Sequence, residues 1–297
     1  MKRLGVIGIK GGWSSEKLAD AVAEETGERI LIETDKLWFD GENEKVYYDD
    51  LDLGLFDGLF IKKIGSEYSP NYLDRLEILR FLSERFGIRM FSKPGNIMKL
   101  LNRLSCTITL KTAGVPMPPT VITEDINIAK KAVFNFKKAV LKPLFSTKAK
   151  GMIVVDTQNT DSDYSVEDSI NSFINAGNKV IYIQKMLDIP EKDYSVAFLG
   201  GKYLAAYARE KTNNSWNTTT DSGGRYLVHE PCSEMLAIAQ KSQELFNLDF
   251  TSVDIAKTRD GVFVFEVSAF GGFKGLKSAN DIDAAKLYVS YALKELS

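Results

Sequence analysis

Residues 251–276 constrain the fold of this 297-residue chain more than any other stretch. Two runs rich in β-branched and aromatic residues, 252–257 and 262–269, flank the short connection Arg259-Asp260-Gly261. This pattern predicts a β-hairpin with a three-residue turn whose last position, Gly261, is left-handed. Because a short turn leaves little freedom in strand pairing, the turn also predicts the register of the hairpin.

The predicted register places two carboxylates opposite each other. With the turn centred on Asp260, Asp254 lies opposite Glu266, and Ser268 falls on the same face because side chains alternate along a strand. Opposed carboxylates repel each other without a cation, and a divalent ion such as Mg2+, shared with substrate phosphates, would resolve this. A hairpin with an acidic, solvent-facing side is the alternative, and these residues alone favour neither. The apolar face is expected to hold Val253, Ile255, Phe265 and Val267.

Composition and charge exclude several classes of protein. A net charge of -2 at pH 7 provides no basic surplus for nucleic acid or an anionic membrane. No segment approaches the roughly 20 apolar residues that cross a bilayer, and residues 1–12 do not form a signal peptide. We therefore expect a cytoplasmic protein that acts without nucleic acid or membrane, and whose length allows two or more lobes.

The first part of the chain, residues 1–94, is predicted to be a small α/β domain. Strands are expected at residues 3–9, 29–33 and 58–62, and helices at 14–26 and 72–86. The glycine-rich turn at residues 8–12 follows the first strand but does not match the dinucleotide-binding fingerprint, so a structural turn is favoured over a ligand loop. Residues 92–95, Ser-Lys-Pro-Gly, mark the end of this domain.

The rest of the chain combines strands with polar loops. Lys142 lies in an apolar strand, where its ammonium group must reach water or meet an anion. The loop at residues 145–151 carries two lysines and fits either a phosphate cover or a solvated hairpin tip. Helices are expected at 96–112, 125–137, 165–176, 231–246 and 281–296, strands at 152–156, 179–187, 193–199 and 202–209, an extended connector at 117–120 and a polar loop at 211–224.

The order of these parts resembles the ATP-grasp fold. A lysine-bearing strand, a loop ending in glycine, the strand KVIYIQKML, a Gly-Gly hairpin and an arginine precede SVDI…FEVSAFGGFKGL. The nearest branch is the RimK-like ligases, which add glutamate or similar amino acids to a protein or small-molecule carboxylate. The resemblance covers about residues 96–276 and implies an α/β protein with three parts: a Rossmann-like pre-ATP-grasp domain (1–94), a first ATP-grasp lobe (95–187) and a C-terminal lobe with the metal site (188–297).

The resemblance also implies how ATP is bound. Lys142 matches the lysine that binds the phosphates, Arg103 takes the place of a second, helix-borne lysine, and Asp193 matches the acidic residue at the ribose. The loop that folds over the phosphates would include Ser146 and Lys148. The hinge strand whose backbone binds adenine would comprise Gln184, Lys185, Met186 and Leu187.

For catalysis, the resemblance implies Arg209 beside the γ-phosphate and a metal held by Asp254, Glu266 and Ser268. The metal would be Mg2+, with Mn2+ as an alternative. Three positions depart from the family pattern: Ser268 stands where the third metal ligand is usually Asn, Ser195 where an arginine is usual, and Thr219 where the polar loop usually has Asn. These departures indicate a divergent branch.

The expected function is an ATP-dependent carboxylate–amine ligase acting through an acylphosphate. Its partners would be a small-molecule or peptide carboxylate and an amino-acid amine, and a homo-oligomer is left open. Candidates for acceptor recognition are residues 211–225, Lys274 and residues 10–12. Two alternatives stay open: a small-molecule kinase of the same fold, and a nucleotide-binding regulator with weak catalysis.

Overall fold

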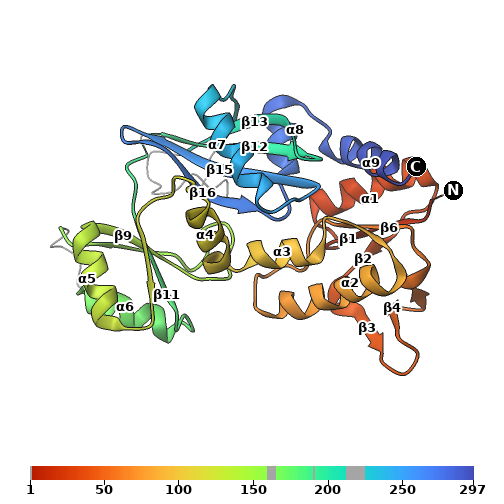
Figure 1. Cartoon of the computed structure of the whole chain (residues 1–297), viewed down its shortest axis with the longest axis horizontal. Coiled ribbons are helices and arrows are strands. Elements are labelled where there is room, and N and C mark those ends of the chain that lie inside the picture. Colours follow the sequence, from red (N-terminus) through yellow and green to blue (C-terminus); the bar gives the residue numbers. More distant parts are fainter. Residues whose placement is uncertain (1, 159–164, 190, 212–224) are drawn as a thin grey trace.

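The computed structural model describes residues 2–158, 165–189, 191–211 and 225–297. Within these residues the strands form a parallel sheet, two larger antiparallel sheets and a small antiparallel ribbon, arranged as three bodies (Figure 1). The mixed helix and sheet architecture confirms the predicted α/β class. No helix in the described ranges has the length and apolar character needed to cross a membrane.

The first body is built on a parallel sheet of order β2-β1-β6-β7. All four residues of β1 and of β6 are buried, as expected for parallel strands covered on both faces. The last helix of the chain packs on α1, so both termini lie on this side of the molecule (Figure 1). The elements are β1 (Leu4–Ile7), α1 (Trp13–Thr26), β2 (Leu31–Ile32), β6 (Gly58–Ile61), α2 (Asn71–Phe86) and β7 (Arg89–Phe91).

A three-stranded ribbon that the sequence analysis missed extends this body. Its strands pair in the order β3-β4-β5 and are bounded by two short 3-10 helices. The buried side chains of Val46 and Leu53 join it to the main core. Its elements are η1 (Thr34–Lys36), β3 (Leu37–Asp40), β4 (Lys45–Tyr48), β5 (Leu51–Asp52) and η2 (Leu53–Leu55).

The glycine-rich turn before α1 is a structural turn. Its amide groups donate within the protein: Ile9 N to Ser15 Oγ at 3.1 Å and Gly11 N to Glu16 Oε1 at 2.6 Å. A Cβ atom at Gly8 would lie 2.7 Å from the side chain of Ser15, so glycine permits the close approach. Two of the turn amides are thus bound by side chains of α1, and those of Gly8 and Gly12 donate to backbone carbonyls.

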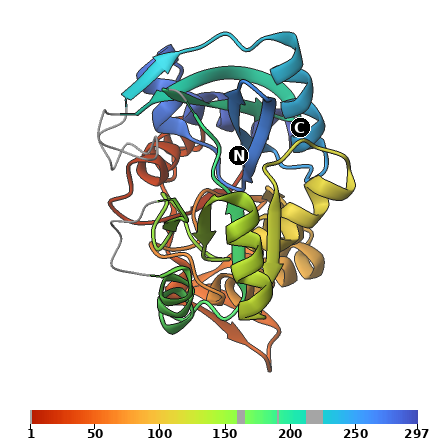
Figure 2. The ribbon, with the colours of Figure 1, turned by 90° about the vertical axis from the view of Figure 1, so that its left-hand side faces the viewer.

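The second body is a sheet of order β10-β9-β11-β8, all antiparallel, with α5 and α6 packed together on one face (Figure 2). Ala129, Leu141 and Phe173 belong to its separate hydrophobic core. Strand β8 was not predicted; it begins at Thr120, the last residue of the expected connector 117–120. The elements are β8 (Thr120–Thr123), α5 (Ile126–Phe136), β9 (Lys138–Lys142), β10 (Ile153–Asp156), α6 (Val166–Asn175) and β11 (Ile181–Lys185).

The predicted helix at residues 96–112 is wrong in one respect, because the structure breaks it at Asn102. Helix α3 (Pro94–Leu101) ends there and α4 (Arg103–Thr112) begins. Asn102 has extended backbone angles, and its side chain accepts hydrogen bonds from the amides of Leu104 and Ser105, as an N-cap does. The break makes Arg103 the first residue of α4.

The third body is an antiparallel sheet of order β14-β13-β12-β15-β16, which lies above the second body in Figure 2. Helix α8 packs on β13 and β14, and α7 packs on β15 and β16. Strand β14 and helix α8 were not predicted. The elements are β12 (Lys192–Leu199), β13 (Lys202–Glu210), β14 (Arg225–Val228), α7 (Ser233–Glu244), β15 (Phe250–Thr258), β16 (Gly261–Ser268), α8 (Phe273–Asn280) and α9 (Ala284–Glu295).

The β15–β16 hairpin confirms the predicted pairing of Asp254 with Glu266 but corrects its cause. Thr258 pairs with Gly261, so the turn has two residues and not three. The register shifts between Asp254 and Ile255, because Phe265 is an extra residue on β16. This bulge restores the expected pairing and turns Phe265 toward a cavity, whereas the sequence analysis placed it on the apolar face.

Candidate active site

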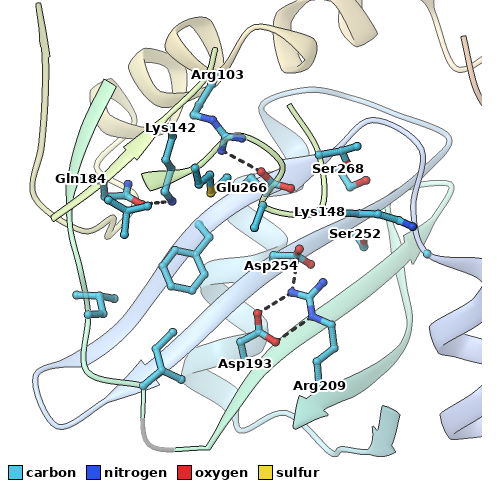
Figure 3. Close-up of a pocket in the computed structure, with 18 of the residues that line it drawn as sticks. Arg103, Lys142, Lys148, Gln184, Asp193, Arg209, Ser252, Asp254, Glu266 and Ser268 are labelled. Carbon is cyan, nitrogen blue, oxygen red and sulfur yellow. Dashed lines mark hydrogen bonds and ion pairs between the residues drawn. The ribbon is translucent and has the colours of Figure 1, made fainter. Parts of the chain in front are cut away.

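The candidate site is a cavity of about 350 Å³ lined by residues of the second and third bodies and by Lys63 of the first. Its volume is in the range of small-molecule sites. Apart from Ser146, every residue predicted to bind ATP or metal lines it: Arg103, Lys142, Lys148, Gln184, Lys185, Met186, Leu187, Asp193, Arg209, Asp254, Glu266 and Ser268. Figure 3 labels most of them. Ser146 lines a smaller adjoining cavity.

One wall of the cavity is acidic and is held by Arg209. The guanidinium group donates to both carboxylate oxygens of Asp193, from Nε at 2.9 Å and from Nη2 at 2.8 Å, and Nη2 lies 3.0 Å from Asp254 Oδ2 (Figure 3). Asp193 and Asp254 are largely buried. Burial raises the pKa of Asp254 to about 6, Arg209 opposes this shift, and Glu266 adds to it. The repulsion expected between the opposed carboxylates is therefore present.

The acidic wall has a donor set that fits Mg2+ shared with phosphates. The described residues contain no cluster of three or more His, Cys, Asp or Glu side chains that could hold a metal by itself. Asp254, Glu266 and the hydroxyl of Ser268 line one cavity. Mg2+ is typically bound by one or two carboxylates together with substrate phosphates, and this wall offers two.

The facing wall is cationic and centres on Lys142 at the end of β9. Its ammonium group donates to Gln184 Oε1 at 2.6 Å (Figure 3). It lies 5.4 Å from the centre of the Phe265 ring. Burial, and next the charge of Arg103, lower the pKa of Lys142 to about 7, whereas Glu266 opposes the shift. A lysine in this state gains most from a new anion nearby.

Arg103 joins the two walls. From the start of α4 its side chain donates to Glu266 Oε2 at 3.2 Å (Figure 3). It also donates to Pro143 O at 3.1 Å and to Ser146 Oγ at 3.3 Å. The side chain is only 9% exposed. Arg103 therefore fixes the loop after β9 relative to the hairpin.

One end of the cavity is mainly apolar. Residues 184–187 line it together with Val140, Met152 and Ile189. The amide of Lys185 donates to Pro119 O at 2.8 Å and that of Met186 to Lys138 O at 2.9 Å. A planar base at this end would thus have to use other backbone groups of the segment.

Sequence reasoning missed several lining residues, chiefly Lys63, Tyr207 and Phe265. The glycines of GGFKG could have indicated the large side chain of Tyr207, because only glycine fits against its ring. A Cβ atom on Gly275 would lie 2.3 Å from that ring. Of the acceptor candidates, Lys211 lines the cavity, whereas Lys274 and residues 10–12 do not, and residues 212–224 lie outside the described ranges. Lys63 lies far from the motifs in sequence and left no signal.

Solved structures share this fold over the whole chain. The ATP-grasp ligase PsnB, complexed with a phosphomimetic variant of its minimal precursor, Mg and ADP, superposes with a TM-score of 0.75 at 13% identity, covering 100% of this chain and 99% of PsnB. D-alanyl-alanine synthetase A from Vibrio cholerae gives a TM-score of 0.69 at 13% identity, with 100% and 99% coverage. The chain thus has the fold of these ATP-grasp ligases.

The family follows from sequence. A model of the RimK-like ATP-grasp domain matches residues 101–291, and the chain belongs to this family. The tetrahydromethanopterin:alpha-L-glutamate ligase of Methanococcus maripaludis is 25% identical over 296 residues, which are 98% of each chain. A probable alpha-L-glutamate ligase of Methanococcoides burtonii is 24% identical and covers 95% of this chain and 92% of its own. The predicted assignment to RimK-like ATP-grasp ligases is confirmed.

Proposed function

We propose that this protein joins a carboxylate to the amino group of L-glutamate, or of a similar amino acid, at the expense of ATP. The observation that carries the proposal is the pairing of the two walls. Asp254 and Glu266 face a cavity whose other side holds Lys142. An anionic phosphate chain with its divalent cation would satisfy both walls at once. The glutamate comes from the names of the relatives.

The proposed roles follow the geometry. Lys142 and Lys148 bind phosphates, residues 184–187 hold the base, and Asp193 lies at the ribose side. Nε and Nη2 of Arg209 contact the carboxylates of Asp193 and Asp254. Nη1 contacts no other group in the described part of the chain and is proposed to bind the γ-phosphate. Bound Mg2+, with Asp254, Glu266 and Ser268 as ligands, would stabilise charge on the phosphate oxygens, and Mn2+ accepts the same oxygen ligands.

The chemistry needs no side-chain nucleophile. A carboxylate oxygen attacks the γ-phosphorus, and the bond to the bridging oxygen breaks with its electron pair leaving on ADP. The amine nitrogen then attacks the acyl carbon, the bond to phosphate breaks, and the amine releases a proton. The chain contributes position and charge: Lys142 and Arg209 offset the negative charge, and the loop at residues 145–151 would exclude water.

The assignment is tested by product analysis. The purified protein is incubated with MgATP and tetrahydromethanopterin, dicarboxylic acids or short peptides, each with and without a pool of amino acids. We expect ADP and phosphate only when both substrates are present, with a product heavier by one amino acid less water. A product heavier by one phosphoryl group, formed from an alcohol alone, would identify a kinase. Binding of MgATP without turnover across the panel would favour the regulator.

The lowered pKa of Lys142 predicts proton uptake when a nucleotide binds. At pH 8 a lysine with a pKa of about 7 is mostly neutral, and adjacent phosphates raise the pKa and protonate it. Binding of MgADP should therefore take up close to one proton at pH 8 and much less at pH 6. Titration calorimetry in buffers of different ionisation enthalpy measures the uptake. Lys142→Met should abolish it, and Lys138→Met, an exposed lysine on the same strand, should not. Equal uptake in the Lys142→Met variant would refute the assignment.

A further inference from the structure

A second cavity of about 80 Å³ shares lining residues with the main cavity, and the region where the two meet is the candidate for the acceptor site. The base-side segment 184–187, Asp193 and Arg209 line the large cavity only. The small cavity therefore lies beyond the metal wall, away from the end that would hold the nucleotide base. The residues lining both cavities are Lys63, Arg103, Thr147, Phe265, Glu266 and Ser268.

Lys63 reaches this junction from the first body. It follows β6, and its amide donates to Ile7 O at the end of β1, at 3.2 Å. The sheet order β2-β1-β6-β7 places β2 on one side of β1 and the later strands on the other, so the strand order reverses between β1 and β6. In open α/β sheets, ligands bind at the carboxyl ends of the strands at such a reversal.

The neighbouring Lys62 fixes this part of the backbone. Its buried ammonium group donates to Phe270 O and, at 2.9 Å, to Gly271 O, and it lies 3.5 Å from the centre of the Phe273 ring. Gly271 lines the main cavity. Lys62 thus ties the end of β6 to the cavity wall and holds the backbone of Lys63 against the site.

The ammonium group of Lys63 is not paired with a carboxylate in the described ranges. Its ammonium group lies 5.1 Å from the centre of the Phe270 ring, and among the described residues its side chain makes no hydrogen bond or ion pair. Burial, and next the charge of Lys148, lower its pKa to about 8. Arg103 and Arg209, by contrast, are paired with carboxylates. A poorly solvated cation beside a second cation is stabilised by an anion that binds between them.

We propose that Lys63 binds the acceptor carboxylate at the junction of the two cavities and holds it beside the γ-phosphate. The inference rests on the proposed ligase function and assigns its acceptor site. Lys63 lines the small cavity, which the base-side segment does not reach, and a carboxylate that attacks the γ-phosphorus must lie on the side away from ADP. The ammonium group of Lys63 keeps its charge during phosphoryl transfer. It would remain hydrogen-bonded to the acyl oxygen of the acylphosphate. The substrate class is then an anionic acceptor that enters past the first body.

Site-resolved lysine acylation separates this role from phosphate binding without any turnover. The protein is treated with trace acetic anhydride alone, with MgAMPPNP, and with MgAMPPNP plus each carboxylate of the panel, and the acetylation rates of Lys63 and Lys142 are read by peptide mass spectrometry. We expect MgAMPPNP to slow the acetylation of Lys142 at least about fivefold. The acetylation rate of Lys63 should stay within about twofold of its value without ligand. A carboxylate of the panel should then slow Lys63. If MgAMPPNP alone slows Lys63 as much as Lys142, or if no carboxylate slows it, the proposal is wrong.

Variants provide the second readout. Lys63→Met should raise the KM of the acceptor by about ten- to a hundredfold and leave the Kd of MgAMPPNP within about twofold, because a charge-assisted hydrogen bond is lost at one substrate only. Lys63→Arg should keep the acceptor KM close to the wild-type value, and Lys17→Met, at an exposed lysine of the first body outside both cavities, should match the wild type. An unchanged acceptor KM, or a tenfold weaker Kd of MgAMPPNP, would overturn the proposal. Protection of Lys63 by a carboxylate without amide product would contradict the ligase function alone.

Discussion

Glu266→Gln should lower kcat by at least about a hundredfold while the protein stays folded. The substitution keeps the shape and an oxygen that can accept from Arg103 Nη1, but it removes one of the two opposed carboxylates that we assign to the metal. Loss of one electrostatic group that acts on the transferred phosphoryl group costs about this much. The side chain is 46% exposed, so the free energy of unfolding should change by less than about 1 kcal/mol.

The metal assignment is read separately from the rate. The Kd of ADP is measured with Mg2+ and with a chelator, and in wild-type protein Mg2+ should tighten binding. In Glu266→Gln the tightening should largely vanish while metal-free binding stays the same. Asp260→Asn, a charge removal at the exposed turn of the same hairpin, serves as the control and should behave as wild type. A large loss of stability with unchanged dependence on Mg2+ would show that the carboxylate pair is structural.

Local sequence patterns were enough to predict many of the residues that line the candidate cavity. Strand alternation and a short turn were enough to bring Asp254 opposite Glu266, and an apolar strand was enough to locate Lys142. Even there the cause was partly wrong, since a two-residue turn and a bulge produce the pairing. No local sequence pattern predicts this bulge, and the bulge is what turns Phe265 toward the cavity.

What the sequence could not predict depends on contacts between distant segments. Lys63 lines the site because the parallel sheet places the end of β6 against the C-terminal sheet, and nothing near residue 63 indicates this. The break at Asn102 is an N-cap inside an otherwise helical pattern, and the pattern alone favours one continuous helix. Strand β8 becomes a strand because it pairs with β11, which is 58 residues away at Ile181 and Thr123. Tertiary pairing overrides local preference in each case.

Arg209→Met should cost about 3–5 kcal/mol of stability, the largest such effect we expect in the site. The guanidinium group serves two largely buried carboxylates, Asp193 and Asp254, whose side chains are 8% and 15% exposed. Removing it leaves both charges without a partner in a poorly solvated wall, and breaking a buried pair from one side has this cost. Thermal unfolding without nucleotide should show a drop of about 10 °C.

The pH dependence of that loss follows from Asp254. Its pKa is already raised to about 6 by burial, against the opposing charge of Arg209, so removing Arg209 should raise the pKa further. A group whose pKa is raised on folding contributes stability that is present at low pH and lost as pH rises through the folded-state pKa. The deficit of Arg209→Met should therefore be smaller at pH 5 than at pH 8, as measured by urea unfolding.

A second substitution tests whether unpaired charge is the cause. In the Arg209→Met background, Asp193→Asn removes one of the two stranded carboxylates and should recover a substantial part of the lost stability, although Asp193→Asn alone should destabilise the wild type. Such a sign change is the coupling that a double-mutant cycle detects. If the two losses simply add, and the deficit is the same at pH 5 and pH 8, then Arg209 acts through packing of its side chain and the acidic wall carries no electrostatic strain for a metal to relieve.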